Sequence, residues 1–322
     1  MESSPAEDRR PALALRAAQM YYMQDQTMEA IARELAMSRS SVSRLLSHAR
    51  DTGLVEIRVH SPLERGSLLE RRIGERYRVT AHVVPMPQVI PDVDRLDRVA
   101  TTAGRLVSSF VDSNDVIGVA WGSTMNAVGR HLARKDVRNT VVVQMNGAGN
   151  MHTTGIDYAS AILQQFGEAF GSQVQEFAVP AFFDDPATRD ALWRERSVRR
   201  VLGIQGRMDM AIFSLGSPFS GVPSHVYIGG YLEPRDFKSL TADRAIGDVA
   251  TVFFRSDGSS HGIALNARAS GPDLARLARV ARRVCVVSGV QKLPALRGAL
   301  AAGLITDLIL DEGLATELLE SA

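Results

Sequence analysis

The chain has 322 residues with 37 basic and 36 acidic side chains, a formal net charge of +1 and 45% hydrophobic residues. These values fit a soluble globular protein of two domains and exclude a strongly basic or low-complexity chain. No apolar run approaches the roughly 20 residues of a spanning helix and no signal-peptide pattern opens the chain, so we expect a cytoplasmic protein without a membrane partner.

Residues 1–10 are polar and charged and contain Pro5, which predicts a disordered tail. A first helix is expected over residues 11–24, because Pro11 suits a helix start. Met28, Ile31, Ala32 and Leu35 then recur at helical spacing and predict a second, amphipathic helix.

A further helix should begin after a tight break at residues 36–37, with Ser38 as its N-cap. Its apolar positions are Val42, Leu45 and Leu46. The other face carries short hydroxyls and guanidinium groups, which suit base edges and phosphates. The arrangement predicts a helix-turn-helix that binds a double-stranded DNA operator through Ser38, Arg39, Ser40, Ser41, Ser43, Arg44 and His48.

Gly53 ends this helix, and residues 54–59 alternate polar and apolar side chains as a strand does. A strand after the recognition helix is typical of winged DNA-binding modules, whereas an ordinary pair of packed helices is the alternative. Residues 9–60 hold eight arginines and five acids, a local basic surplus suited to phosphate contact. We expect a DNA-binding domain over residues 11–60, followed by a linker helix over 61–79, which is either part of an oligomer contact or simply solvated.

From residue 80 onward, short apolar runs alternate with amphipathic stretches, which predicts an α/β effector domain over 80–322 with a parallel sheet covered by helices on both faces. The expected strands are 82–84, 116–120, 140–145, 174–179, 208–213, 249–253, 284–287 and 308–310. The expected helices are 95–111, 123–134, 156–170, 187–202, 272–282, 291–302 and 312–320. Cys285 lies within an expected strand and is interpreted as a buried thiol.

Several loops rich in small residues follow these strands. Gly122, Ser123 and Thr124 lead into a helix, where free backbone N–H groups and the helix dipole favour an anion. Asn146 and Gly147 follow the next strand, and a third loop covers residues 215–218. The carboxyl ends of parallel strands share one sheet edge, so a common ligand site is expected there.

Lys292 and Asp257 complete the candidates, although a solvated helix lysine and a simple turn are the simpler explanations for them. We find no nucleophile elbow, no metal-ligand spacing among the histidines and no phosphate-loop lysine motif. Asp184 and Asp185 are interpreted as helix-capping acids. The sequence therefore predicts no enzyme, no metal and no cofactor.

The chain resembles the SorC family of bacterial transcriptional regulators over roughly residues 11–320. The resemblance rests on SRSSVSRLLSHARDTGLVEIRV at 38–59, GVAWGST at 118–124, QMNGAG at 144–149, FAVPAFF at 177–183, MDMAIFSLGSP at 208–218, AIGDVATVFF at 245–254, VVSGVQKLPALRGAL at 286–300 and LILDEGLATELL at 308–319. It implies a winged helix-turn-helix head and a Rossmann-like effector domain similar to phosphosugar isomerases and deaminases of the glucosamine-6-phosphate type.

The same resemblance implies a homodimer or homotetramer that binds DNA and responds to a sugar, polyol or sugar phosphate. It places Gly122, Ser123, Thr124, Asn146, Gly147, Asp257 and Lys292 around the ligand. The chain departs from the family where paired glycines are usual, at Ala148 and Val290, and where an acid is usual, at Arg255. The alternatives are a sugar-phosphate isomerase with a fused DNA-binding head, and a constitutive DNA-binding protein.

Overall fold

The computed structural model describes residues 10–55, 62–87, 89–217 and 224–320. The chain divides into two compact units, Met1–Ser61 and Pro62–Ala322. Each unit has a hydrophobic core of its own.

The first unit contains three helices, α1 (Arg10–Tyr22), α2 (Met28–Glu34) and α3 (Arg39–Asp51). Its core joins alanines of α1 to Ile31 of α2 and to the apolar face of α3. Thr27 and Ser38 cap α2 and α3 by accepting backbone N–H groups with their side chains. Ala36 turns the chain between these helices with a φ of 51°. The expected N-cap and the order of the helices are thus present.

The strand expected at 54–59 lies mainly outside the described residues, which resume at Pro62, and so does the tail expected at 1–10, apart from Arg10.

The second unit is built on a seven-stranded sheet with the order β1-β9-β8-β5-β2-β3-β4, in which every pairing is parallel. Side chains of these strands alternate between two cores: Val284 and Val286 face one, and Cys285 and Val287 face the other. The strands are β1 (Thr80–Val84), β2 (Val116–Val119), β3 (Val141–Gln144), β4 (Gln173–Gln175), β5 (Met210–Phe213), β8 (Arg282–Val287) and β9 (Asp307–Asp311). The α/β class with a parallel sheet is confirmed.

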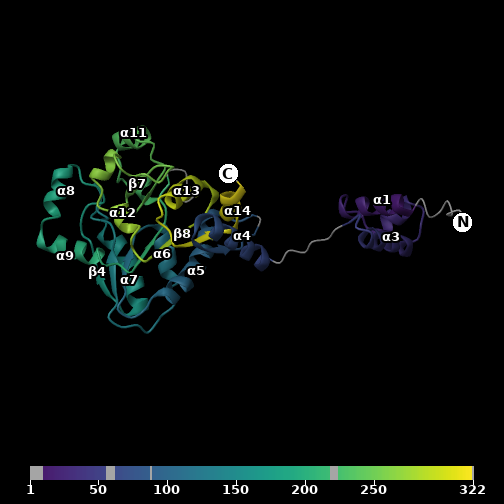
Figure 1. Cartoon of the computed structure of the whole chain (residues 1–322), viewed down its shortest axis with the longest axis horizontal. Coiled ribbons are helices and arrows are strands. Elements are labelled where there is room, and N and C mark those ends of the chain that lie inside the picture. The colour runs from purple at the N-terminus through teal and green to yellow at the C-terminus, as the bar shows by residue number, and fades with distance from the viewer. Residues whose placement is uncertain (1–9, 56–61, 88, 218–223, 321–322) are drawn as a thin grey trace. The chain divides into compact units, whose positions relative to one another are not determined.

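Helices cover both faces of this sheet (Figure 1). One face packs against α5 (Asp92–Phe110), α6 (Ser123–Arg130) and α7 (Ile156–Phe170). The other packs against α4 (Pro62–Tyr77), α9 (Arg196–Gln205), α12 (Leu274–Leu277), α13 (Leu293–Ala301) and α14 (Glu312–Glu320). The remaining helices are α8 (Pro186–Leu192), α10 (His225–Ile228), α11 (Pro234–Ala242) and the 3-10 turns η1 (Ala264–Ala267) and η2 (Val290–Lys292).

The strand expected at 249–253 is wrong. The chain instead forms an antiparallel hairpin of β6 (Gly247–Val249) and β7 (Val252–Phe254), outside the main sheet. The turn residues Ala250 and Thr251 have φ values of 47° and 70°. Because Asp248 accepts the Thr251 N–H, the apolar run folds back on itself.

Two of the expected helices also differ from the helices in the structure. The helix expected at 187–202 is divided into α8 and α9, because the Trp193 ring between them packs on Phe177 and Phe183 in the core. The helix expected at 272–282 shortens to α12, since the backbone of Arg282 already donates to Asp209 at the start of β8.

The helix α4, which we expected to form a separate linker, packs within the second unit. The Glu70 carboxylate accepts the Val83 N–H of β1 at 2.8 Å. Arg76 and the Tyr77 hydroxyl donate to the carbonyls of Leu319 and Leu318 in α14. The second unit therefore begins with α4.

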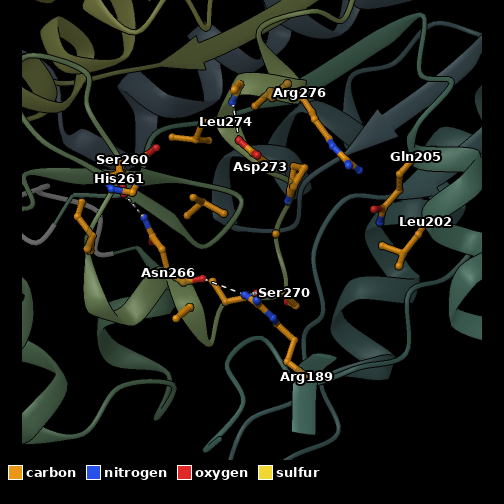
Figure 2. Close-up of a pocket in the computed structure, with 18 of the residues that line it drawn as sticks. Arg189, Leu202, Gln205, Ser260, His261, Asn266, Ser270, Asp273, Leu274 and Arg276 are labelled. Atoms are coloured by element: carbon orange, nitrogen blue, oxygen red, sulfur yellow. Dashed lines mark hydrogen bonds between the residues drawn. The ribbon is translucent and has the colours of Figure 1, made fainter. Parts of the chain in front are cut away.

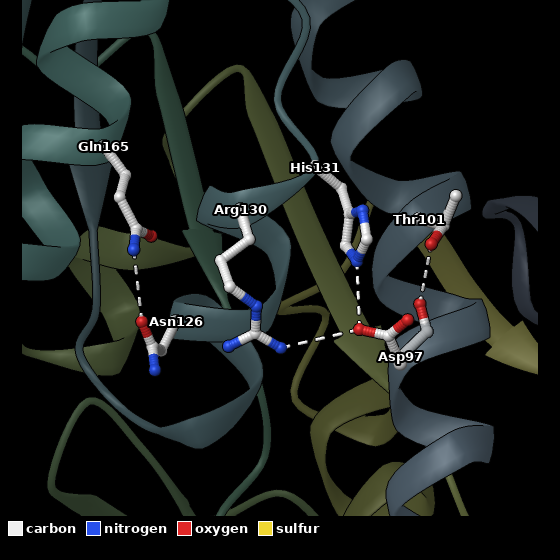
Figure 3. Close-up of polar contacts among 6 residues, drawn as sticks. All are labelled: Asp97, Thr101, Asn126, Arg130, His131 and Gln165. Carbon is white, nitrogen blue, oxygen red and sulfur yellow. Dashed lines mark hydrogen bonds and ion pairs between the residues drawn. The ribbon is translucent and has the colours of Figure 1, made fainter.

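Polar contacts fix α6 between its two neighbours (Figure 3). His131, the C-cap of α6, forms a 2.9 Å hydrogen bond with Asp97 of α5, which lowers the pKa of Asp97. Gln165 of α7 donates to Asn126 of α6 at 3.3 Å. These contacts set the direction in which the N-terminus of α6 points.

Candidate functional site

The strand order places a topological switch point between β2 and β5. The chain proceeds from β2 outward to β3 and β4, and from β5 in the opposite direction to β8 and β9. Ligands of open α/β sheets bind outside the carboxyl ends of the strands at such a point. A cavity of about 50 Å³ lies there, lined by the segments that follow β2, β3 and β5.

The N-terminus of α6 forms one wall of this cavity. Gly122 is the N-cap with a φ of 146°, a conformation that side chains rarely adopt, and no side chain caps the helix. The first N–H groups of a helix have no partner within it, so those of Ser123 and Thr124 are available to an anion. Both residues line the cavity.

The end of β3 supplies a second wall. Asn146 is only 1% exposed, and its side-chain Oδ1 has no hydrogen-bond partner in the described part of the chain. Its backbone carbonyl, in contrast, accepts from Gln144 at 2.7 Å and from the Trp121 indole at 3.2 Å. A buried acceptor without a partner is costly, so Oδ1 has the capacity to accept a hydrogen bond from a ligand.

Lys292 lies at the end of η2 and is 8% exposed, so it is not a solvated helix lysine. Its Nζ donates to the Leu215 carbonyl. Asp311 holds the turn by accepting the Gly289 N–H at 2.7 Å. Burial lowers the pKa of Lys292 to about 8, which still leaves the ammonium charged at neutral pH.

Asp248 is a residue of this cavity that our sequence reasoning missed. It is 3% exposed, and burial raises the pKa of its carboxyl to about 6. Its Oδ1 accepts from the Tyr227 hydroxyl at 3.1 Å and its Oδ2 from the Thr251 N–H at 3.2 Å. An acid within the apolar run 245–254 was the available signal, because buried acids need partners.

The cavity is covered by residues 224–226, and its lining includes Ser214 and His225, which we also did not predict. The buried Ser214 hydroxyl has no hydrogen-bond partner among the described residues. Burial lowers the pKa of His225, which favours the neutral ring. Uncharged hydrogen-bonding groups thus line the cavity together with Lys292 and Asp248, whose charges interact.

Of the predicted effector residues, the structure brings together Gly122, Ser123, Thr124, Asn146 and Lys292 at this cavity. Gly147 and Asp257 are not part of its lining. A Cβ on Gly147 would lie 2.2 Å from the Val179 carbonyl, so this glycine permits close packing of two chain segments. Asp257 accepts the Ser259 N–H within a turn.

Larger clefts of about 1260 and 930 Å³ also occur in the second unit. Size alone does not identify a binding site, and we favour the small cavity because it combines unpartnered buried atoms with a buried ammonium at the switch point.

In the described ranges, no cluster of His, Cys, Asp or Glu side chains could hold a metal ion. None of the helices described is long and apolar enough to cross a membrane.

In the first unit, the polar face of α3 is exposed at Arg39, Ser40, Ser43 and Arg44, whereas Ser41 and His48 are half-buried. The Ser38 hydroxyl lies 2.8 Å from that of Ser40 and 2.9 Å from that of Ser41. Arg39 pairs with Glu29 at 3.1 Å. Arg44 is therefore the exposed guanidinium of this face without an ion pair in the described structure.

A family model described as "Putative sugar-binding domain" matches residues 61–320. The deoxyribonucleoside regulator of Bacillus subtilis (strain 168) is 30% identical over 305 residues, which cover 93% of this chain and 95% of that protein. A solved domain of a possible sugar-binding transcriptional regulator from Arthrobacter aurescens TC1 is 56% identical, covers 80% of this chain and 99% of its own, and has a TM-score of 0.75. The full-length sorbitol operon regulator SorC from Klebsiella pneumoniae shares the fold, with a TM-score of 0.72, 22% identity, and coverage of 96% and 99%.

Proposed function

Because this chain belongs to the SorC family of transcriptional regulators, which share the matched sugar-binding domain, we propose that it is a transcription factor whose operator binding is controlled by a sugar, polyol or sugar phosphate. The genes it controls would serve the breakdown of such a carbohydrate. The relatives reported above carry the names of regulators and not of enzymes, which supports regulation over the isomerase alternative.

The observation that carries the effector proposal is the combination of a buried ammonium with unpartnered buried acceptors in one cavity. Lys292 and the first N–H groups of α6 suit a phosphate or another anion. Asn146 and Asp248 suit hydroxyl donors. A molecule with a phosphate at one end and hydroxyls at the other satisfies both sets, in an arrangement like the phosphate loop of phosphosugar isomerases.

The effector must enlarge the cavity, since about 50 Å³ accommodates only a few water molecules. The segment 224–231, whose residues 224–226 line the cavity, is the movable cover in this proposal. Its hydrogen bonds to the rest of the second unit include those from Asn150 to the Gly229 carbonyl, from the Tyr231 hydroxyl to the Ala148 carbonyl and from the Tyr227 hydroxyl to Asp248. Movement of this segment on binding would be the first step of the response.

The first unit is proposed as a winged helix-turn-helix head, with α3 in the major groove and the wing in the region after Gly53. Arg44 and Ser43 would reach base edges, and Ser38, Arg39, Ser40, Ser41 and His48 would contact or position the backbone. One head recognises one half-site, so we propose a homodimer or homotetramer in which linked heads raise the affinity. Effector binding would shift the population of DNA-competent arrangements by about 1–3 kcal/mol.

The decisive experiment is fluorescence anisotropy on DNA from the upstream region of the gene, with a panel of sugars, polyols and their phosphates. A compound that shifts the binding curve would establish the regulator and its effector class. Tight binding that no compound changes would support a constitutive DNA-binding protein. Absence of DNA binding even at low salt, together with turnover of a sugar phosphate, would support the isomerase instead.

A further inference from the structure

The cleft of about 1260 Å³ lies apart from the effector cavity, between α8 and α9 on one side and residues 260–280 on the other (Figure 2). Its charged lining consists of three arginines and one aspartate. Asp273 already accepts the Ala275 N–H at 2.8 Å as the cap of α12. Arg189 is also engaged, because it donates to the Asn266 carbonyl and pairs with Asp190.

Arg276 and Arg279 are the free charges of this cleft. Neither has an ion pair within the described ranges, and Arg279 donates only to the Ala275 carbonyl. In Figure 2 the Arg276 side chain points from α12 toward the side of the cleft formed by Leu202 and Gln205. Arg276 lies in α12 and Arg279 in the turn that follows it, and two arginines can bind two negative groups with charge-assisted hydrogen bonds.

The floor of the cleft is bonded directly to the strand end that forms the effector cavity. The Gln205 amide donates to the carbonyls of Gln144 at 2.7 Å and Met145 at 3.2 Å. The Ser270 hydroxyl accepts the Gly147 N–H at 2.9 Å. Residues 144–147 therefore contact the cleft through their backbone, while the Asn146 side chain lines the effector cavity.

We propose that this cleft is a second ligand site, which binds a small molecule with two or more negative groups, and that its occupancy is coupled to the effector cavity through Gln205 and Ser270. Arg276 and Arg279 attract the negative groups of the ligand, and the hydrogen bonds of Gln205 and Ser270 connect the cleft to residues 144–147. A ligand that displaces Gln205 or Ser270 changes the hydrogen bonds of residues 144–147 and thereby the position of Asn146. A ligand bound at this site would be a second signal that controls the regulator proposed above.

Isothermal titration calorimetry of the full chain tests the site, with inorganic pyrophosphate and citrate as probes and orthophosphate as the single-group reference. The double variant Arg276→Ala/Arg279→Ala should weaken binding of at least one probe about tenfold or more. Arg199→Ala/Arg200→Ala is the matched control, because it removes the same charge from exposed positions of α9 outside the cleft. This control should bind as the unaltered chain does.

Lys292→Met separates the two sites. Binding that persists in Lys292→Met and is lost in Arg276→Ala/Arg279→Ala supports the cleft, whereas the reverse pattern assigns the probes to the effector cavity and overturns the proposal. Equal loss in the cleft variant and its control indicates unspecific attraction, and absence of binding to any probe overturns the second site. None of these readouts involves DNA, so failure here is distinct from failure of the regulator proposal.

Trp121 reports the coupling, since its indole donates to the Gly147 carbonyl at 2.8 Å and the chain has only two tryptophans. In Trp193→Phe, whose probe affinity is first checked by calorimetry, the probe should shift the emission of Trp121. The same experiment in Trp193→Phe with Arg276→Ala/Arg279→Ala should show no shift. Binding without any change at Trp121 would leave the site in place and refute its coupling to the effector cavity.

Discussion

The hydroxyl of Tyr227 donates a 3.1 Å hydrogen bond to Oδ1 of Asp248. This contact joins the segment that covers the cavity at the switch point to the buried acid of that cavity, because Tyr227 lies in α10 and Asp248 in the hairpin strand β6. The hydrogen bond lowers the pKa of Asp248, but burial acts more strongly and raises it to about 6. The cover and the charge state of the cavity are therefore linked.

Asp248 should make the stability of the chain depend on pH. Its carboxyl has a folded pKa of about 6 and an ordinary value of 3.8, so its contribution is fully present below pH 4 and is lost as the pH rises through about 6. The shift corresponds to about 3 kcal/mol. Urea unfolding of the unaltered chain and of Asp248→Asn from pH 4 to 7 measures the difference, and parallel pH dependences would refute the assignment.

In Tyr227→Phe, the stability that Asp248 contributes should be lost at a higher pH than in the unaltered chain. The variant lacks the hydrogen bond that stabilises the carboxylate, so the pKa of Asp248 rises further above its value of about 6. At neutral pH the variant should also lose about 1.5–3 kcal/mol, the usual contribution of a hydrogen bond to a charged group. The same urea series shows both changes, and the shift in pH dependence should vanish when Tyr227→Phe is combined with Asp248→Asn, which has no carboxyl to titrate.

Lys292→Met should remove the effector response and leave operator binding intact. The loss of the buried ammonium should weaken an anionic effector at least about tenfold, since charge-assisted hydrogen bonds are the strong ones. Lys238→Met is the control, because Lys238 is exposed on α11 and does not line the cavity. An unchanged dose response in Lys292→Met, measured by anisotropy, would exclude this cavity as the effector site.

Thr124→Tyr tests the opposite wall of the same cavity. Thr124 is 7% exposed in the first turn of α6, and a tyrosine ring there fills the space in front of the free N–H groups. We expect normal operator binding and no response to the effector. Anisotropy titrations with and without the effector decide this, and a response of normal size would show that the ligand binds elsewhere.

Arg44→Ala should remove operator binding while effector binding persists. Arg44 is exposed on α3, and the loss of a bidentate base contact costs about 1–3 kcal/mol for each head, which a dimer doubles. Arg16→Ala provides the control, since this α1 arginine forms a surface pair with Glu34. Loss of effector binding together with DNA binding would argue against two independent units.

Sequence reasoning located the cavity because its walls follow apolar strands. Gly122 and Asn146 follow within two residues, and Lys292 within five, of a run that could be recognised as a strand, and parallel strands bring such loops to one edge. The parallel sheet itself followed from the alternation of strands and helices. These features depend on local pattern and are therefore readable along the chain.

Asp248 and the hairpin that carries it depend instead on contacts between distant segments. The sequence predicts one strand at 249–253, whereas the turn at residues 250–251 and the hydrogen bonds with Tyr227 and Gly216 give Asp248 its position. Trp193 divides the expected helix at 187–202 for the same reason, since its partners Phe177 and Phe183 precede that helix. Tertiary contacts overrule local periodicity at these places.

Substitutions of Ser38 should separate helix capping from DNA contact. Its hydroxyl accepts the Ser41 N–H at 3.2 Å as the N-cap of α3, so Ser38→Ala should destabilise the first unit by about 1 kcal/mol. Ser38→Asp keeps a good cap and favours the positive end of the helix dipole, so its stability should equal that of the unaltered chain. Hydrogen exchange of the α3 amides in the full chain measures the stability of the first unit in both variants.

Operator binding should respond differently from stability. The aspartate places a negative charge on the face proposed to meet DNA phosphates, so Ser38→Asp should bind the operator more weakly than Ser38→Ala although its helix is better capped. The difference in operator affinity between the two variants should become smaller as the salt concentration increases, because salt screens the repulsion between the aspartate and the phosphates. If Ser38→Asp binds the operator as well as the unaltered chain, the start of α3 does not face the phosphate backbone, and the proposed docking of the head is wrong.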